Sequence, residues 1–104
     1  MSRIEALRQF VAAQPNDPFP RYGLAMELKN AGKLEEAAAE FAELEKRHAD
    51  YVAQYLMHAG VQRQLGRKSD ARAVIERGIA AAKKKGDAHA LGELQGTLAE
   101  LDDE

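Results

Sequence analysis

The chain has 104 residues, a net charge of −2, and no cysteine or tryptophan. A length near 100 residues fits one domain, and the small net charge gives no overall attraction to nucleic acid or a membrane. The lack of cysteine excludes disulfides, thiolate catalysis and cysteine-ligated metal centres. We expect a single domain over residues 1–104 in the cytoplasm, because no apolar run approaches the length of a signal core or a membrane span.

Apolar residues recur at helical spacing along the whole chain, and no segment alternates with the period of a strand. Proline and glycine interrupt the pattern between helices. The sequence therefore predicts an all-α protein with six helices, at residues 2–14, 18–31, 34–48, 51–65, 68–85 and 87–102.

Several helix starts carry a capping residue. Ser2 stands three residues before Glu5, which is a capping-box pattern. Asp17, Asp50 and Asp87 precede the second, fourth and sixth helices, where an aspartate side chain can accept hydrogen bonds from free backbone N–H groups. We predict that all four residues are N-caps.

Charge is distributed unevenly among the helices. Residues 63–85 contain eight basic and two acidic residues, a net of +6, whereas residues 86–104 contain six acidic and no basic ones, a net of −6. The basic fifth helix is expected to pair with acidic neighbours or to form a solvated convex face, not to bind nucleic acid. Glu36, Glu40 and Glu43 of the third helix are expected to face outward. The end of the sixth helix, Asp102-Asp103-Glu104, has the wrong charge for a helix C-terminus and is expected to fray.

A short segment returns after 34 residues. Residues 32–37 read GKLEEA and residues 66–71 read GRKSDA. Glycine can adopt the left-handed conformation that ends a helix, and the alanine leaves room for two helices to approach closely. Ala25 likewise falls on Ala59, so each copy predicts a helix–turn–helix elbow within a repeat.

The period and the positions of these residues resemble the tetratricopeptide repeat family. The pattern positions of the first copy are Arg21, Leu24, Ala25, Leu28, Ala37, Phe41 and Ala49; those of the second are Tyr55, His58, Ala59, Gln62, Ala71, Ile75 and Lys83. The resemblance implies a superhelix of antiparallel helix pairs. It comprises an N-terminal half-repeat, two full repeats and a C-terminal capping helix.

The second copy departs from the pattern at His58 and Gln62, where apolar residues are usual. These two residues are one helical turn apart and can hydrogen-bond to each other or to a neighbouring carbonyl. A rotation of the helix that buries Val61 and Leu65 instead is an equally open alternative.

Few residues suggest chemistry. Glu45 and His48, and also His89 and Glu93, have spacings used by metal sites, but each pair lacks further ligands nearby in sequence. His58 is more simply a structural, hydrogen-bonded histidine. We expect no catalytic activity, no metal and no cofactor.

The resemblance implies that the first helix of each pair lines a concave face that binds a peptide segment of a partner protein. Aromatic residues, methionines, amides and two cations suit this function. Self-association through an open end of the array is the alternative. The residues expected on the concave face are Phe19, Tyr22, Met26, Lys29, Asn30, Leu56, Met57, Gly60, Arg63, Gln64 and Leu94.

Overall fold

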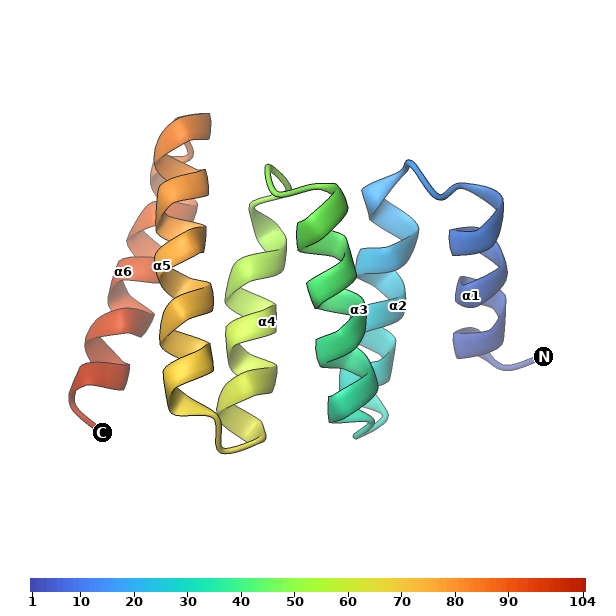
Figure 1. Cartoon of the computed structure of the whole chain (residues 1–104), viewed down its shortest axis with the longest axis horizontal. Helices are drawn as coiled ribbons and strands as arrows, with labels where there is room; N and C mark the ends of the chain where they lie inside the picture. The colour runs from blue at the N-terminus through green and yellow to red at the C-terminus, as the bar shows by residue number, and fades with distance from the viewer. The chain divides into compact units, whose positions relative to one another are not determined.

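The computed structural model describes all residues 1–104 and contains six α-helices and no strand (Figure 1). The all-α prediction is confirmed, and most helix ends lie within a residue of the predicted ones. No helix combines the length and apolar character that crossing a membrane requires. The helices are α1 Arg3–Ala13, α2 Pro18–Asn30, α3 Leu34–Arg47, α4 Ala53–Gln64, α5 Lys68–Lys85 and α6 Ala88–Asp102.

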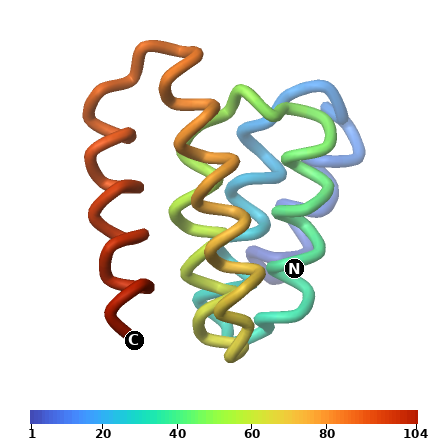
Figure 2. The backbone as a smooth tube through the Cα atoms, turned by 60° about the vertical axis from the view of Figure 1, so that its left-hand side comes forward, coloured from blue at the N-terminus to red at the C-terminus, as the bar shows by residue number.

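The helices form two compact units, residues 1–49 and residues 50–104. In the first unit, α2 packs against both α1 and α3. In the second unit, α5 packs against both α4 and α6, and α4 also contacts α6. Within each unit, helices that follow each other along the chain run in opposite directions, as the tubes in Figure 2 show.

The two elbows have the same backbone geometry. Gly32 and Gly66 have φ angles of 78° and 76°, in the left-handed region that favours glycine. The N–H of the residue after each glycine donates to the carbonyl four residues before that glycine, on Leu28 at 2.9 Å and on Gln62 at 2.8 Å. This bonding closes a helix C-terminus and repeats after 34 residues. The predicted helix–turn–helix elbows are therefore confirmed.

Local capping was predicted correctly at three of four positions. Ser2, Asp17 and Asp87 each accept a hydrogen bond from a backbone N–H in the first turn of the following helix, at 3.0 or 3.1 Å. These bonds satisfy donors that have no partner inside the helix. Because a cap depends on residues next to each other in sequence, these three helix starts follow from local sequence alone.

The prediction that Asp50 caps α4 is wrong. The helix begins at Ala53, and the residue before it, Val52, is buried in the core of the second unit. Backbone N–H groups at the start of α4 donate to the carbonyls of Tyr51 and Val52, at 3.3 Å, in a turn that brings Val52 inward. Asp50 instead interacts with Lys85, whose Nζ lies 3.2 Å from the Asp50 backbone oxygen.

Each unit buries the small residues of the repeat together with larger apolar side chains. Ala25 and Ala37 in the first unit and Ala59 and Ala71 in the second are completely buried, which permits close contact between helices. The larger buried residues of the first unit are Leu24, Leu28, Phe41 and Leu44. Those of the second unit are Val52, Tyr55, Val61, Val74, Ile75, Leu94 and Leu101.

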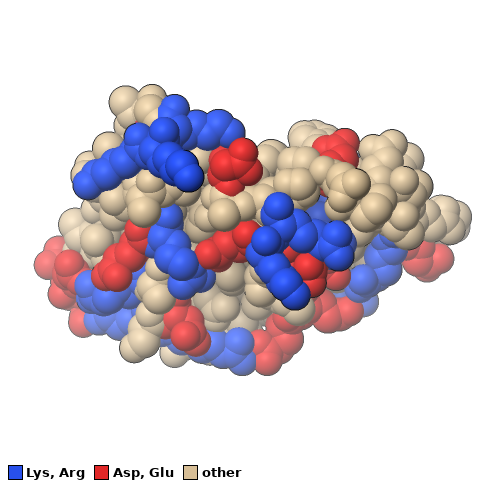
Figure 3. Space-filling model, turned by 45° about the horizontal axis from the view of Figure 1, so that its top comes forward, with Lys and Arg blue, Asp and Glu red and all other residues tan.

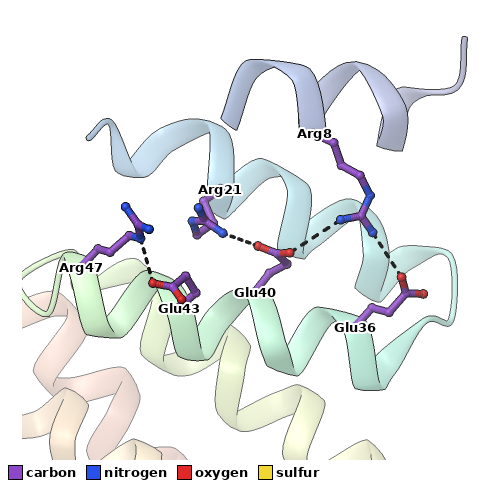
Figure 4. A network of polar contacts seen from close by, with 6 residues as sticks. All are labelled: Arg8, Arg21, Glu36, Glu40, Glu43 and Arg47. Carbon is purple, nitrogen blue, oxygen red and sulfur yellow. Dashed lines mark hydrogen bonds and ion pairs between the residues drawn. The ribbon is translucent and has the colours of Figure 1, made fainter. Parts of the chain in front are cut away.

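An ion-pair network connects the three helices of the first unit (Figure 4). Glu40 of α3 lies between Arg21 of α2, at 2.6 Å, and Arg8 of α1, at 3.7 Å. Arg8 also lies 3.2 Å from Glu36. The expectation that Glu40 points outward is wrong, because two arginines reach it and leave its side chain only 20% exposed.

Candidate peptide-binding surface

One row of side chains on α2 forms the accessible part of the candidate surface in the first unit. Phe19 is 68% exposed, although aromatic side chains usually bury much more of their area. Tyr22 is half-buried, with its ring edge-on to Phe41 and the ring centroids 6.3 Å apart. The row therefore combines a free aromatic ring with one held by the core. Its other members are the half-buried Met26 and Lys29 and the exposed Asn30.

A second row follows one face of α4 in the second unit. Leu56 and Met57 are half-buried, and Leu56 packs against the hydrophobic core. Gly60 lies one turn further along, and a Cβ added there would meet no atom within 4 Å. Gly60 therefore leaves a position without a side chain between the apolar residues Leu56 and Met57 and the polar end of the row. The polar end consists of Arg63 and Gln64.

Leu94 does not belong to this surface. It is 1% exposed and lies in the core of the second unit, where an added Cβ on Gly78 would come within 3.2 Å of its Cδ1 atom. The glycine leaves the space that Leu94 fills. The expectation that Leu94 faces a ligand was therefore wrong, because the leucine row of α6 faces α5.

Arg63 and Gln64 also line a surface cavity of about 480 Å³, which we call the elbow pocket. The other residues lining it are Gly66, Lys68 and Glu104. The carboxylate of Glu104 accepts a hydrogen bond from Arg63 at 2.6 Å, and Lys68 donates to the Glu104 main-chain oxygen at 2.8 Å. The hydrogen bond to Glu104 raises the pKa of the Arg63 guanidinium above its ordinary value. Figures 1 and 2 show the end of α6 on the same side of the unit as the elbow.

Lys68 and Glu104 were not among the predicted site residues. Residue spacing within α4 cannot reveal them. Lys68 is the first residue of α5, and Glu104 follows α6. The opposite net charges of residues 63–85 and 86–104 were the available signal. That signal correctly predicted that basic residues of α5 pair with acidic neighbours.

The acidic end of α6 is bound rather than frayed. Besides Glu104, Asp102 forms an ion pair with Arg72 of α5, and Glu100 lies 3.6 Å from Arg63. These cations offset the unfavourable charge of the helix end, which the sequence of α6 alone could not show. Figure 3 shows acidic and basic side chains interleaved on one face of the protein.

His58 and Gln62 form the hydrogen-bonded pair that the sequence suggested. Their Nε2 atoms are 3.3 Å apart, and His58 is only 4% exposed. Val61 is fully buried as well, while Leu65 remains half-exposed. The helix therefore keeps the polar pair in place, and the alternative rotation that buries Val61 and Leu65 instead of the pair is not observed.

The remaining histidines do not assemble a metal site. His89 lies 3.3 Å from Glu93, but both side chains are at least half exposed, and His48 is half-buried at the end of α3. No group of three or more His, Asp or Glu side chains is arranged to hold a metal ion.

The helix pairs α2–α3 and α4–α5 each turn at a glycine and follow each other with a 34-residue period. This arrangement defines a helical-repeat protein built from α-hairpins. No family model and no curated protein matches the sequence. Solved structures do match. The solution structure of a tetratricopeptide repeat domain protein from Salinibacter ruber is 34% identical, with a TM-score of 0.81 over 86% of this chain and 90% of that one. The chain belongs to the tetratricopeptide repeat family.

Two further solved structures are similar to the chain. A crystal structure of a tetratricopeptide repeat domain protein from Salinibacter ruber is 34% identical, with a TM-score of 0.78 over 83% of this chain and 97% of that one. A protein from Bordetella parapertussis is 21% identical and shares the fold, with a TM-score of 0.83 over 99% of this chain and 90% of that one. Proteins of this family are typically non-catalytic and mediate protein–protein interactions, which supports a role as an interaction module in general.

Proposed function

We propose that the chain binds peptide segments of a partner protein through the side-chain row of α2 in the first unit and, separately, through the row of α4 in the second. The observation that carries the proposal is the exposed Phe19 in line with Tyr22 and Met26 on one face of α2. Aromatic residues and methionine are enriched at the contact surfaces of protein–protein interfaces. Methionine adapts its shape to different side chains, which suits a peptide ligand.

The polar members of the two rows have complementary tasks in this proposal. Lys29 and Arg63 attract carboxylates, and the amides of Asn30 and Gln64 can donate to and accept from a peptide backbone. The proposed interaction involves no catalytic step, cofactor, metal, nucleic acid or membrane. We propose the cytoplasm as its location, which microscopy of a fluorescent fusion would test.

The test is a pull-down from cell lysate with the captured proteins identified by mass spectrometry. The variant Tyr22→Glu/Met26→Glu places two charges in the α2 row and is expected to abolish capture. A matched control, Ala39→Glu/Ala42→Glu, adds the same charge at exposed positions of α3 in the same unit. Because Tyr22 also supports Phe41, the exposed Phe19→Glu serves as a second variant that spares the core. Capture that survives all the α2 changes would overturn the proposal.

Self-association is the second candidate, and one residue favours it. Phe10 of α1 is 56% exposed, whereas its counterpart 34 residues later, Leu44, is fully buried. A bulky apolar residue thus stands exposed at a position that the repeat elsewhere covers. Light scattering over a range of protein concentrations tests this candidate. The mass of the natural chain is expected to rise with concentration. The rise should disappear in Phe10→Gln and persist in Phe19→Gln. A constant monomer mass would remove this candidate.

A further inference from the structure

The start of α5 has an unusual charge for a helix N-terminus. The first turn of α3 carries two acids, Glu35 and Glu36, which suit the positive end of the helix dipole. The first turn of α5 begins with Lys68, follows Arg67 and contains a single acid, Asp70. Glu104 approaches this turn from the end of α6, and its main-chain oxygen accepts a hydrogen bond from Lys68 at 2.8 Å.

The chain reversal at Gly66 concentrates positive charge in the elbow pocket. It brings Arg63, in the last turn of α4, and Lys68, the first residue of α5, to the same cavity. A guanidinium presents five N–H donors in a planar fork, and an ammonium presents three more. The volume of about 480 Å³ is in the range of cavities that hold small ligands or a few side chains. The pocket therefore fits a segment that carries carboxylates.

The chain's own acidic segment uses these donors. Glu104 bonds to both cations, at 2.6 Å and 2.8 Å, while Asp102 pairs with Arg72 just beyond the pocket. Leu101 is fully buried and fixes the position from which the acidic residues project. Arg63 and Gln64 belong to the α4 row as well as to the pocket, so the acidic segment lies against the polar end of the proposed peptide surface.

We propose that the acidic segment Asp102–Glu104 is an internal competitor: Glu104 lines the elbow pocket and engages both of its cations, which lowers the affinity of the pocket for a carboxylate-bearing segment of a partner. This inference rests on the proposed function, since it regulates one end of that surface. Ion pairs between partly exposed side chains are individually weak, so an external segment can replace the internal one. Because the internal segment belongs to the same chain, its effective concentration at the pocket is high. A competing ligand must therefore reach a higher concentration before it replaces the segment.

The probe is a synthetic peptide with the sequence of residues 98–104, LAELDDE, and its control is LAQLNNQ, in which amides replace the four acids. Binding is followed by the backbone N–H resonances of Gln64 and Gly66 in ¹⁵N-labelled protein. The variant Asp102→Asn/Glu104→Gln removes the side-chain carboxylates that pair with Arg72 and Arg63, and Arg63→Gln/Lys68→Gln removes the cations of the pocket. Two controls match these changes in charge: Glu76→Gln/Glu93→Gln for the first and Lys83→Gln/Lys84→Gln for the second, all at exposed positions of the second unit.

We expect Asp102→Asn/Glu104→Gln to bind LAELDDE roughly fivefold more tightly than the natural chain, the ratio that about one exposed ion pair contributes. Arg63→Gln/Lys68→Gln should lose binding, both charge controls should keep the natural affinity, and added salt should weaken binding. The inference is overturned if Asp102→Asn/Glu104→Gln binds no more tightly than Glu76→Gln/Glu93→Gln, because the acidic segment then only anchors α6. Equal binding of LAELDDE and LAQLNNQ overturns it as well.

The outcome is independent of the test of the proposed function. If the peptide fails these criteria while Tyr22→Glu/Met26→Glu still abolishes partner capture, only the internal competition is wrong. If the peptide meets them while partner capture survives every α2 variant, the α2 surface is wrong and the elbow pocket stands.

Discussion

The helix pairs α2–α3 and α4–α5 have the same elbow and differ in where they place side-chain volume. Leu44 is buried on α3, and its counterpart on α5 is Gly78. Arg21 on α2 has Tyr55 as its counterpart on α4, and a Cβ added to Gly78 would lie only 2.6 Å from the Tyr55 Cβ. In the second unit the large residue is thus on the first helix of the pair and the small one on the second. The repeat fixes the turn and the close approach of the helices, and either helix can supply the bulk.

The core of the second unit is also more polar. His58 and Gln62 occupy the positions at which the first unit buries Leu24 and Leu28. Buried polar groups are tolerated when they bond to each other, and the loss of one partner leaves the other unsatisfied. The two units therefore respond differently to the same kind of substitution.

The largest effect is expected from Phe41→Ala in the first unit. The ring is fully buried and supports Tyr22, so its loss leaves a cavity and should lower the free energy of unfolding by about 3–5 kcal/mol. The matched change in the second unit, Ile75→Ala, removes a smaller side chain that is also fully buried, and its effect should be smaller. Urea unfolding followed by circular dichroism measures both. A loss below that of Ile75→Ala would contradict the prediction.

Substituting alanine for glycine should have opposite effects at two positions of the second unit. At Gly78 the new methyl group would collide with Tyr55, and such overpacking costs about 1–3 kcal/mol. At Gly60 the methyl group meets open space, so the gain in helix propensity, up to about 1 kcal/mol, should appear as added stability. Thermal unfolding of the two variants compares them directly. A stabilising Gly78→Ala would show that Tyr55 moves aside without loss.

A third comparison replaces the polar pair with the residues of the first unit. His58→Leu alone removes the partner of Gln62 and should destabilise the protein by about 1–3 kcal/mol. The double variant His58→Leu/Gln62→Leu removes both polar groups and should recover most of that loss. Denaturant unfolding of the single and double variants gives the coupling. If the two changes are simply additive, the pair makes no energetic contribution of its own.

Sequence reasoning succeeded where a feature depends on neighbouring residues. Gly32 and Gly66 predicted the elbows because left-handed backbone is a local requirement, and Ser2 predicted a cap for the same reason. It failed where a distant residue decides. Asp50 interacts with Lys85 and does not cap α4. Leu94 faces inward because Gly78 of α5 leaves space for it.

The same distinction applies to the candidate site. The α2 and α4 rows follow from helical spacing, and their role in binding stays a prediction. The elbow pocket required Lys68 and Glu104, which only tertiary structure brings to Arg63. The charge pattern indicated which helices attract each other, and it could not indicate which side chains meet.

The smallest expected effect concerns an ion pair that only the first unit has. Arg47 donates to Glu43 at 2.8 Å and lowers the pKa of Glu43, whereas the counterparts of this pair in the second unit are Arg77 and Ala81. A lowered folded-state pKa stabilises the protein above the ordinary glutamate pKa, and the contribution is lost as the pH falls through the folded-state value. In Arg47→Gln the NMR titration midpoint of the Glu43 carboxyl should therefore rise, and the variant should differ in stability from the natural chain only at pH values above that range. An unchanged midpoint would mean that the exposed pair is fully screened by solvent.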